Sequence, residues 1–260
     1  MTTTATFSFT HRPLIPFAHD YHHGDSEPWH QHDCAQLLHS LSGVVRVDTA
    51  SGCWVVPPGR GVWLPADTPH SLRISGNVAA RTLFIDPLAR ADLPASCQVV
   101  QISPLLRELI VTALSLPERY AAGSRAERVM ELILDEIRGM DVLPFALPTP
   151  DSPRLQALCE LIQQTPGESW TLLRASAHLN VSGRTLARHF MRETGLQFSD
   201  WVRRARLAIA LTRLAQGDSV LRVALELGYE SPSAFSAMFR RLLGVSPTDY
   251  FPPAETGLPR

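Results

Sequence analysis

Residues 239–244 read FRRLLG, and residues 190–195, which lie 49 positions earlier, read FMRETG. The two stretches share a phenylalanine, an arginine two residues later and a closing glycine, which suits a left-handed helix cap. Two serines able to cap a helix N-terminus, Ser182 and Ser231, precede them at the same interval. A repeat at one fixed period predicts two copies of one structural unit, each with a helix capped at both ends.

A shorter helix is predicted before each capped helix, in the stretches TLLRASAHLN and SVLRVALELG. These stretches end in Asn180 and Gly228, residue types that tolerate a positive φ. A small residue four positions before each turn would let the two helices cross closely. The sequence therefore predicts two helix-turn-helix units, at approximately 171–195 and 219–244.

The outward face of each second helix indicates contact with DNA. Leu186 and Phe190 define an apolar face, so the helical period places Arg184 and Arg188 together on the opposite face. Arginine pairs with the guanine edge in the major groove, although these side chains could instead form a solvated face. In the second unit, the side chains on the equivalent outward face are small and weakly polar, which favours contacts with phosphates over contacts with bases. The expected DNA-binding residues are Arg184, Thr185, Arg188, Ser233, Ser236 and Arg240.

A long helix is predicted between the two units, in SDWVRRARLAIALTRLAQG, with a cap at Ser199 and a stop at Gly217. With the two units and the segment LGYESPSAFSAMFRRLLGVSPTDY at 227–250, residues from about 152 to 251 resemble the AraC/XylS class of bacterial transcription regulators. The resemblance implies that the two units of one monomer address successive major-groove faces of promoter DNA, roughly 34 Å apart. It also implies base contacts by Arg184 and Arg188, and RNA polymerase as a further partner.

The first half of the chain predicts a different architecture, separated by the proline-rich segment DVLPFALPTPDSP at 141–153. Short β-branched and aromatic runs with glycine and proline punctuation favour antiparallel strands that close into a β-barrel. Two helices should follow the strands, capped at Ser103 and Ser124. The expected fold is a two-domain α+β protein, with residues 1–142 as a cupin-like effector and dimerisation domain and 152–260 as an all-α DNA-binding domain.

The second of these helices carries two apolar rows, and each row could bury against a different partner. One interpretation is a contact between the subunits of a homodimer, and the other is a helix packed entirely within its own domain. The rows consist of Val129, Ile133 and Ile137, and of Met130 and Leu134.

Histidines at 24–43, in GDSEPWHQHDCAQLLHSLSG, resemble the first cupin motif, with Gln36 where that family usually has glutamate. His70 falls in a stretch that resembles the second motif. Alternate residues of a strand face one way, so His30 and His32 can enter the barrel together and meet His70. Three imidazoles suit a divalent transition metal, whereas the neutral Gln36 favours an organic effector. The candidate metal ligands are His30, His32, Gln36 and His70.

The combined pattern predicts a transcription regulator controlled by a small molecule or metal bound in the barrel. One alternative is a metal-dependent cupin enzyme fused to a DNA-binding domain, and another is a structural barrel that serves only to dimerise and binds no ligand. The attached DNA-binding half argues against turnover as the main role, so we expect no enzymatic function.

Composition and charge indicate which cellular compartment and which kind of partner to expect. No run of about 18 apolar residues is present, and the N-terminus lacks the basic flank and apolar stretch of a signal peptide. We therefore expect a soluble, cytoplasmic protein with no membrane partner. The four cysteines lack CxxC spacing, which indicates reduced thiols. Residues 149–260 carry 13 arginines against 10 acidic residues, a balance that suits a phosphate-rich partner.

Overall fold

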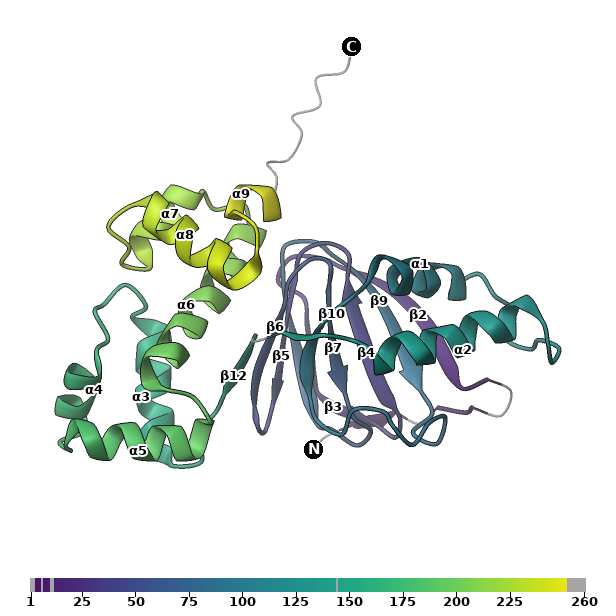
Figure 1. The fold of residues 1–260 in the computed structure, drawn as a ribbon, viewed down its shortest axis with the longest axis horizontal. Coiled ribbons are helices and arrows are strands. Elements are labelled where there is room, and N and C mark those ends of the chain that lie inside the picture. Colours follow the sequence, from purple (N-terminus) through teal and green to yellow (C-terminus); the bar gives the residue numbers. More distant parts are fainter. Residues whose placement is uncertain (1–2, 6, 10–11, 144, 252–260) are drawn as a thin grey trace, which may run out of the picture. The chain divides into compact units, whose positions relative to one another are not determined.

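The computed structural model describes residues 3–5, 7–9, 12–143 and 145–251. It divides into two compact units, residues Met1–Leu147 and Pro148–Arg260. The N-terminal unit is rich in strands and the C-terminal unit is helical, which confirms the predicted α+β class (Figure 1). Among the described residues, no helix combines the length and the apolar character that crossing a bilayer requires.

Two six-stranded sheets form the N-terminal unit. In spatial order the first sheet contains β1 (Thr3–Ala5), β3 (Ser26–His32), β8 (His70–Ser75), β5 (Val44–Thr49), β6 (Gly52–Val56) and β12 (Ala146–Pro148). The second contains β11 (Val142–Leu143), β10 (Gln98–Gln101), β7 (Arg60–Leu64), β4 (Ala35–Ser40), β9 (Val78–Ile85) and β2 (Leu14–Tyr21).

The closed barrel expected from the sequence is replaced by these two separate sheets, because the described strands do not pair around a full circle. From β2 to β9 the chain crosses from one sheet to the other at most connections, the β5–β6 hairpin being the exception. Successive strands therefore face one another across an interior instead of pairing side by side. The proline-rich segment also carries structure, because β11 pairs with β10 and β12 lies beside β6.

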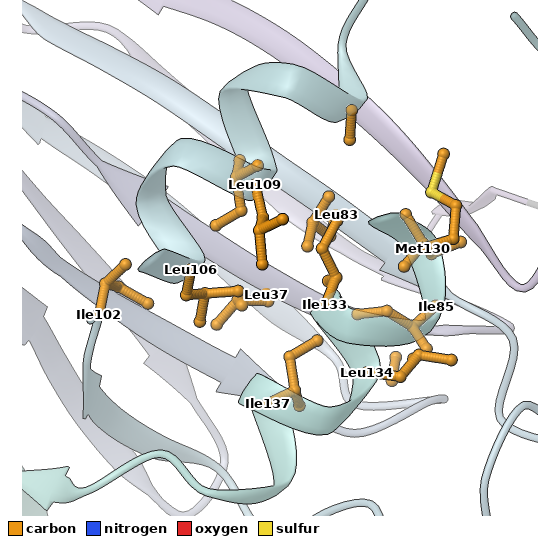
Figure 2. Close-up of a cluster of buried hydrophobic side chains, with 14 of the residues drawn as sticks. Leu37, Leu83, Ile85, Ile102, Leu106, Leu109, Met130, Ile133, Leu134 and Ile137 are labelled. Carbon is orange, nitrogen blue, oxygen red and sulfur yellow. The ribbon is translucent and has the colours of Figure 1, made fainter. Parts of the chain in front are cut away.

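Two helices cover the outer face of the second sheet (Figure 1). They are α1 (Pro104–Ala113) and α2 (Arg125–Arg138), and the Ser103 and Ser124 side chains cap them as predicted. Figure 2 shows their apolar side chains facing Leu37 of β4 and Leu83 and Ile85 of β9. Both apolar rows of α2 are buried in this cluster. The helix thus packs within its own domain, and neither row is left for a second subunit.

The C-terminal unit contains the predicted pair of helix-turn-helix units. They are α4 (Leu172–His178) with α5 (Gly183–Thr194), and α7 (Val220–Glu226) with α8 (Pro232–Leu243). The N-terminal serines and the left-handed glycines cap α5 and α8 as expected. Asn180 and Gly228 adopt φ values of 50° and 75° in the turns, so the positive φ inferred from residue type is confirmed. The remaining helices are α3 (Pro153–Gln164), α6 (Phe198–Ala215) and α9 (Pro247–Tyr250).

The joining helix α6 begins earlier than the sequence indicated. Its N-cap is Gln197, which makes no side-chain cap bond, and Ser199 lies inside the first turn. Trp201 and Phe198 are buried and approach Phe190 of α5 edge-on, at ring-centroid separations of 5.9 and 5.3 Å. This aromatic contact places the helix start, because it holds the first turn of α6 against α5.

The packing of α2 gives a testable difference between neighbouring residues. Ile133 is fully buried in its own domain, so Ile133→Ala should lower the free energy of unfolding by about 2–5 kcal/mol. Leu132 is 39% exposed, and Leu132→Ala should change it by less than about 1 kcal/mol. Urea unfolding of both variants measures this, and equal losses would contradict the placement of α2.

Candidate DNA-binding surface and ligand site

The second helix of the first unit, α5, presents two arginines to solvent. Leu186 and Phe190 are buried, which turns the opposite side of the helix outward. Arg184 and Arg188 on that side are exposed, and neither forms an ion pair with another described residue. Two guanidinium groups one helical turn apart are therefore available to a ligand with closely spaced acceptors.

Thr185 has a structural role in addition to its place near this face. Its amide donates to Ser182 Oγ at 3.1 Å, and the two hydroxyl oxygens lie 2.9 Å apart. The side chain is half-buried and belongs to the N-terminal cap of α5. It lies beside the arginines but is already engaged in hydrogen bonding.

The equivalent face of α8 is smaller and carries its charge toward the C-terminal end. Phe235 and Phe239 are buried, Ser233 is exposed and Ser236 is half-buried. Arg240 is exposed and forms no ion pair with another described residue. Arg241, which was not among the predicted DNA contacts, is equally exposed and forms no ion pair with another described residue.

The three predicted histidines meet in the N-terminal unit. His30 and His32 project from β3 and His70 from β8, with His30 and His70 directly opposite in the antiparallel ladder. One ligand nitrogen from each ring lies within 4.8 Å of the others. Ring centroids are separated by 4.3 Å between His30 and His70 and by 5.0 Å between His30 and His32. The period of two along β3 thus produces the cluster that the sequence predicted.

Hydrogen bonds fix the tautomer of two of these rings. His30 Nδ1 donates to the Pro28 carbonyl and His70 Nδ1 to the Thr68 carbonyl, each at 2.8 Å. A carbonyl can only accept, so in the neutral form of each ring the lone pair resides on Nε2. His70 Nε2 and His32 Nδ1 are buried and have no hydrogen-bond partner among the described residues. Buried nitrogens of this kind require a hydrogen-bond or coordination partner, which a ligand or a water molecule would supply.

Burial keeps two of the imidazoles neutral. Desolvation, together with the neighbouring His30 and His70, lowers the pKa of His32 to about 4. Desolvation likewise lowers the pKa of His70 to about 4, partly opposed by the bond to Thr68. Neutral imidazole is the form that donates a lone pair to a metal, so His32 and His70 are in their ligating form at neutral pH.

A carboxylate that the sequence analysis missed lies beside the cluster. Glu27 Oε2 is 3.4 Å from His30 Nε2, and Glu27 Oε1 accepts a hydrogen bond from the Tyr21 hydroxyl. Burial and the bond to Glu27 raise the pKa of Tyr21. An irregularity in the β3–β8 register between Glu27 and His30 brings both onto one side of the strand. Strict alternation would have placed them on opposite sides.

Gln36 belongs to the facing sheet. It lies on β4 opposite Phe84 of β9, and its side chain is 5% exposed with Oε1 unsatisfied among the described residues. The Phe84 ring packs edge-on against His32 at 5.0 Å and stacks on Phe7 at 4.2 Å. The histidines of one sheet therefore face an aromatic and amide surface on the other, and these aromatic residues were not identified from sequence.

Two different family models match the N-terminal and the C-terminal half of the chain. Residues 15–135 match the family model of the AraC-like ligand binding domain, and residues 175–252 match a helix-turn-helix domain. The HTH-type transcriptional regulator NimR of Escherichia coli K12 is 34% identical over 253 residues, covering 96% of this chain and 92% of NimR. GadX of Escherichia coli O157:H7 is 26% identical over 200 residues, covering 76% and 69%. Apo ToxT of Vibrio cholerae has a TM-score of 0.39 at 14% identity, covering 92% and 97%.

These features define a transcription regulator that joins a ligand-binding domain to a helix-turn-helix DNA-binding domain. The chain belongs to the AraC family, as the resemblance in its second half indicated. The β-rich first half is the family's ligand-binding domain, and the two helix-turn-helix units form its DNA-binding part.

The lowered pKa values predict acid sensitivity of the metal-free protein. The unfolded histidine has a pKa of about 6.5, so the stability linked to His70 is complete above that pH and is lost as the pH falls toward 4. His70→Asn keeps a donor for the Thr68 carbonyl but removes the titrating ring. Urea unfolding with chelator should show a shallower fall in stability between pH ~6.5 and ~4.5 for the variant. Parallel curves for parent and variant would contradict this assignment.

Proposed function

We propose that the first unit of this regulator reads bases and that the second mainly grips the phosphate backbone. The exposed, unpaired arginines of α5 support base reading, because a guanidinium fork matches the O6 and N7 acceptors of guanine. On α8 the small side chains of Ser233 and Ser236 bring the helix close to DNA. Arg240 and Arg241 then reach the phosphates that flank the groove.

The ligand that the N-terminal site fits best is a divalent transition metal. The observation that carries this proposal is the convergence of three histidine nitrogens within 4.8 Å, two of them on rings oriented by carbonyl acceptors. Backbone carbonyls commonly orient metal-binding histidines in this way. When bound, such a metal would supply a fixed positive charge to the site. Glu27, which lies 3.4 Å from His30, would offset that charge.

An organic effector is the second candidate, and the facing sheet favours it. Phe84 and Phe7 provide an apolar surface beside His32, and the unsatisfied Gln36 Oε1 could accept a hydrogen bond from a ligand. In that case the histidine nitrogens would bind polar atoms of the effector.

Regulation without turnover is the proposed role of this domain, and the relatives named above support it because they are named as transcriptional regulators. A homodimer and a contact with RNA polymerase remain predictions. The dimer cannot use the two apolar rows of α2, since both are buried in their own domain. Another surface would have to join the subunits.

The two recognition helices should respond differently to loss of arginine. Arg188→Ala should relax the preferred sequence and cost about 1–3 kcal/mol at one base step. Arg240→Ala should weaken binding to all sequences alike and reduce the salt dependence by about one phosphate contact. Binding-site selection with the full chain, followed by salt titration, measures both effects.

Arg222→Ala is a matched control, because Arg222 is exposed on α7 but paired with Asp218 and Glu226. It should leave the selected sequence unchanged. The assignment of the α5 face fails if Arg188→Ala selects the same sequence with the same affinity as the parent.

Metal content distinguishes the two candidate ligands. Protein purified without a histidine tag or chelator should hold about one equivalent of a transition metal, and His32→Ala should hold less than about a tenth. His22→Ala is the control, since His22 is exposed and lies outside the cluster. Gln36→Glu should tighten metal binding by adding a charge. A parent with less than about a tenth of an equivalent would exclude the metal as the resident ligand.

A further inference from the structure

Two glycines bring the loop that precedes the first helix-turn-helix unit into direct backbone contact with the turn of the second unit. Gly167 lies in the loop between α3 and α4, and Gly228 lies in the turn between α7 and α8. A Cβ added to Gly228 would lie 2.2 Å from the Gly167 carbonyl oxygen. A Cβ added to Gly167 would lie 2.5 Å from the Glu226 carbonyl oxygen. Any larger residue at either position would have to separate the loop from the turn.

An arginine of the joining helix holds the same loop in place. Arg206, near the middle of α6, donates through Nε to the Pro166 carbonyl and through Nη2 to the Glu168 carbonyl, both at 2.9 Å. Its guanidinium also lies 5.8 Å from the centre of the Tyr229 ring, which follows Gly228 in the turn. The Arg206 side chain of α6 thus contacts both the α3–α4 loop and the α7–α8 turn.

The loop and the turn each contact a helix of the adjoining unit. In the loop, Trp170 Nε1 donates to the Thr165 carbonyl at 3.1 Å, and the Trp170 ring lies edge-on to His178 of α4 at 6.3 Å. In the turn, the Tyr229 amide donates to the Ala224 carbonyl at 3.0 Å, and the Tyr229 ring packs edge-on against Phe235 of α8 at 5.5 Å. A displacement at the glycine contact would therefore disturb the contacts with α4 and α8.

We infer that Gly167, Gly228 and Arg206 form a clamp that fixes the separation and orientation of α5 and α8. The inference rests on the proposed contact of both helices with DNA. Each unit also contacts one end of α6, through Trp201 in its first turn and through the ion pairs of Arg213 with Asp218 and Glu226 near its last turn. The clamp adds a second connection between the two units, besides α6 itself. A single connection leaves their relative orientation adjustable, whereas two connections fix it.

The functional consequence is a fixed distance between the two DNA contacts of one monomer. A rigid pair of recognition helices accepts one gap between its two half-motifs, because an inserted half-turn of about 5 base pairs moves one motif to the opposite face of the duplex. The three clamp residues are positioning residues, since none of them lies on the proposed DNA-contacting face.

The test uses the full chain and the two-part sequence that it selects from random duplex DNA. Probes then carry the same half-motifs with one to five base pairs inserted between them. The parent should lose at least about tenfold in affinity on insertion of a half-turn, comparable to loss of one good base contact. Gly167→Ala, which adds a clash without a left-handed φ, should lose less than about threefold over the same insertion.

Two further variants separate positioning from folding. Arg206→Met keeps the apolar stem but removes both hydrogen bonds, and it should relax the gap preference as Gly167→Ala does. Gly244→Ala strains a glycine at φ 82° that has nothing within 4 Å of its added Cβ. It should lower stability yet keep the parent's ratio of affinities between probes.

The inference is overturned if Gly167→Ala and Arg206→Met both keep the parent's gap preference. It is also overturned if the parent itself binds all gaps equally. Failure of the proposed base reading would be seen separately, as an unchanged selected sequence for Arg188→Ala at the original gap.

Discussion

Burial of aromatic side chains along one face of each recognition helix is the constraint on which the DNA-binding half depends. Phe190 of α5 and Phe235 and Phe239 of α8 are fully buried. Each helix can satisfy that burial in one rotation only, and this rotation turns Arg188 and Arg240 outward. The capping serines and left-handed glycines then fix where each helix begins and ends. The orientation of the charged groups is thus a consequence of packing, and no separate interaction has to hold them.

In the ligand-binding half, burial keeps the imidazoles of His32 and His70 neutral and able to bind a ligand. His32 and His70 lie between two sheets, where desolvation disfavours the imidazolium form and lowers the pKa of both to about 4. Their unpartnered nitrogens carry a desolvation cost that a bound metal or effector would offset. The stability of the domain and its occupancy are therefore linked, because a ligand that binds the folded state alone stabilises it.

Local signals explain what could be predicted from the sequence. Capping residues and a fixed repeat located α5 and α8, and alternation along β3 brought His30 and His32 together. Features produced by tertiary contact could not be predicted. Glu27 reaches His30 across a strand irregularity, and the contact between Gly167 and Gly228 joins segments that share no local pattern. The predicted barrel failed for a related reason, since local strand signals do not reveal which sheet each strand joins.

We propose that two helices of one monomer contact DNA in consecutive major grooves and that α5 reads bases. Methylation of guanine N7 blocks the acceptor that an arginine fork requires, so methylation interference on a selected site measures this base reading. Guanine methylation should interfere in the segment bound by α5, with weaker or no interference about one helical turn away on the same face, where α8 is proposed to contact phosphates. Absence of interference by any guanine would contradict base reading by α5.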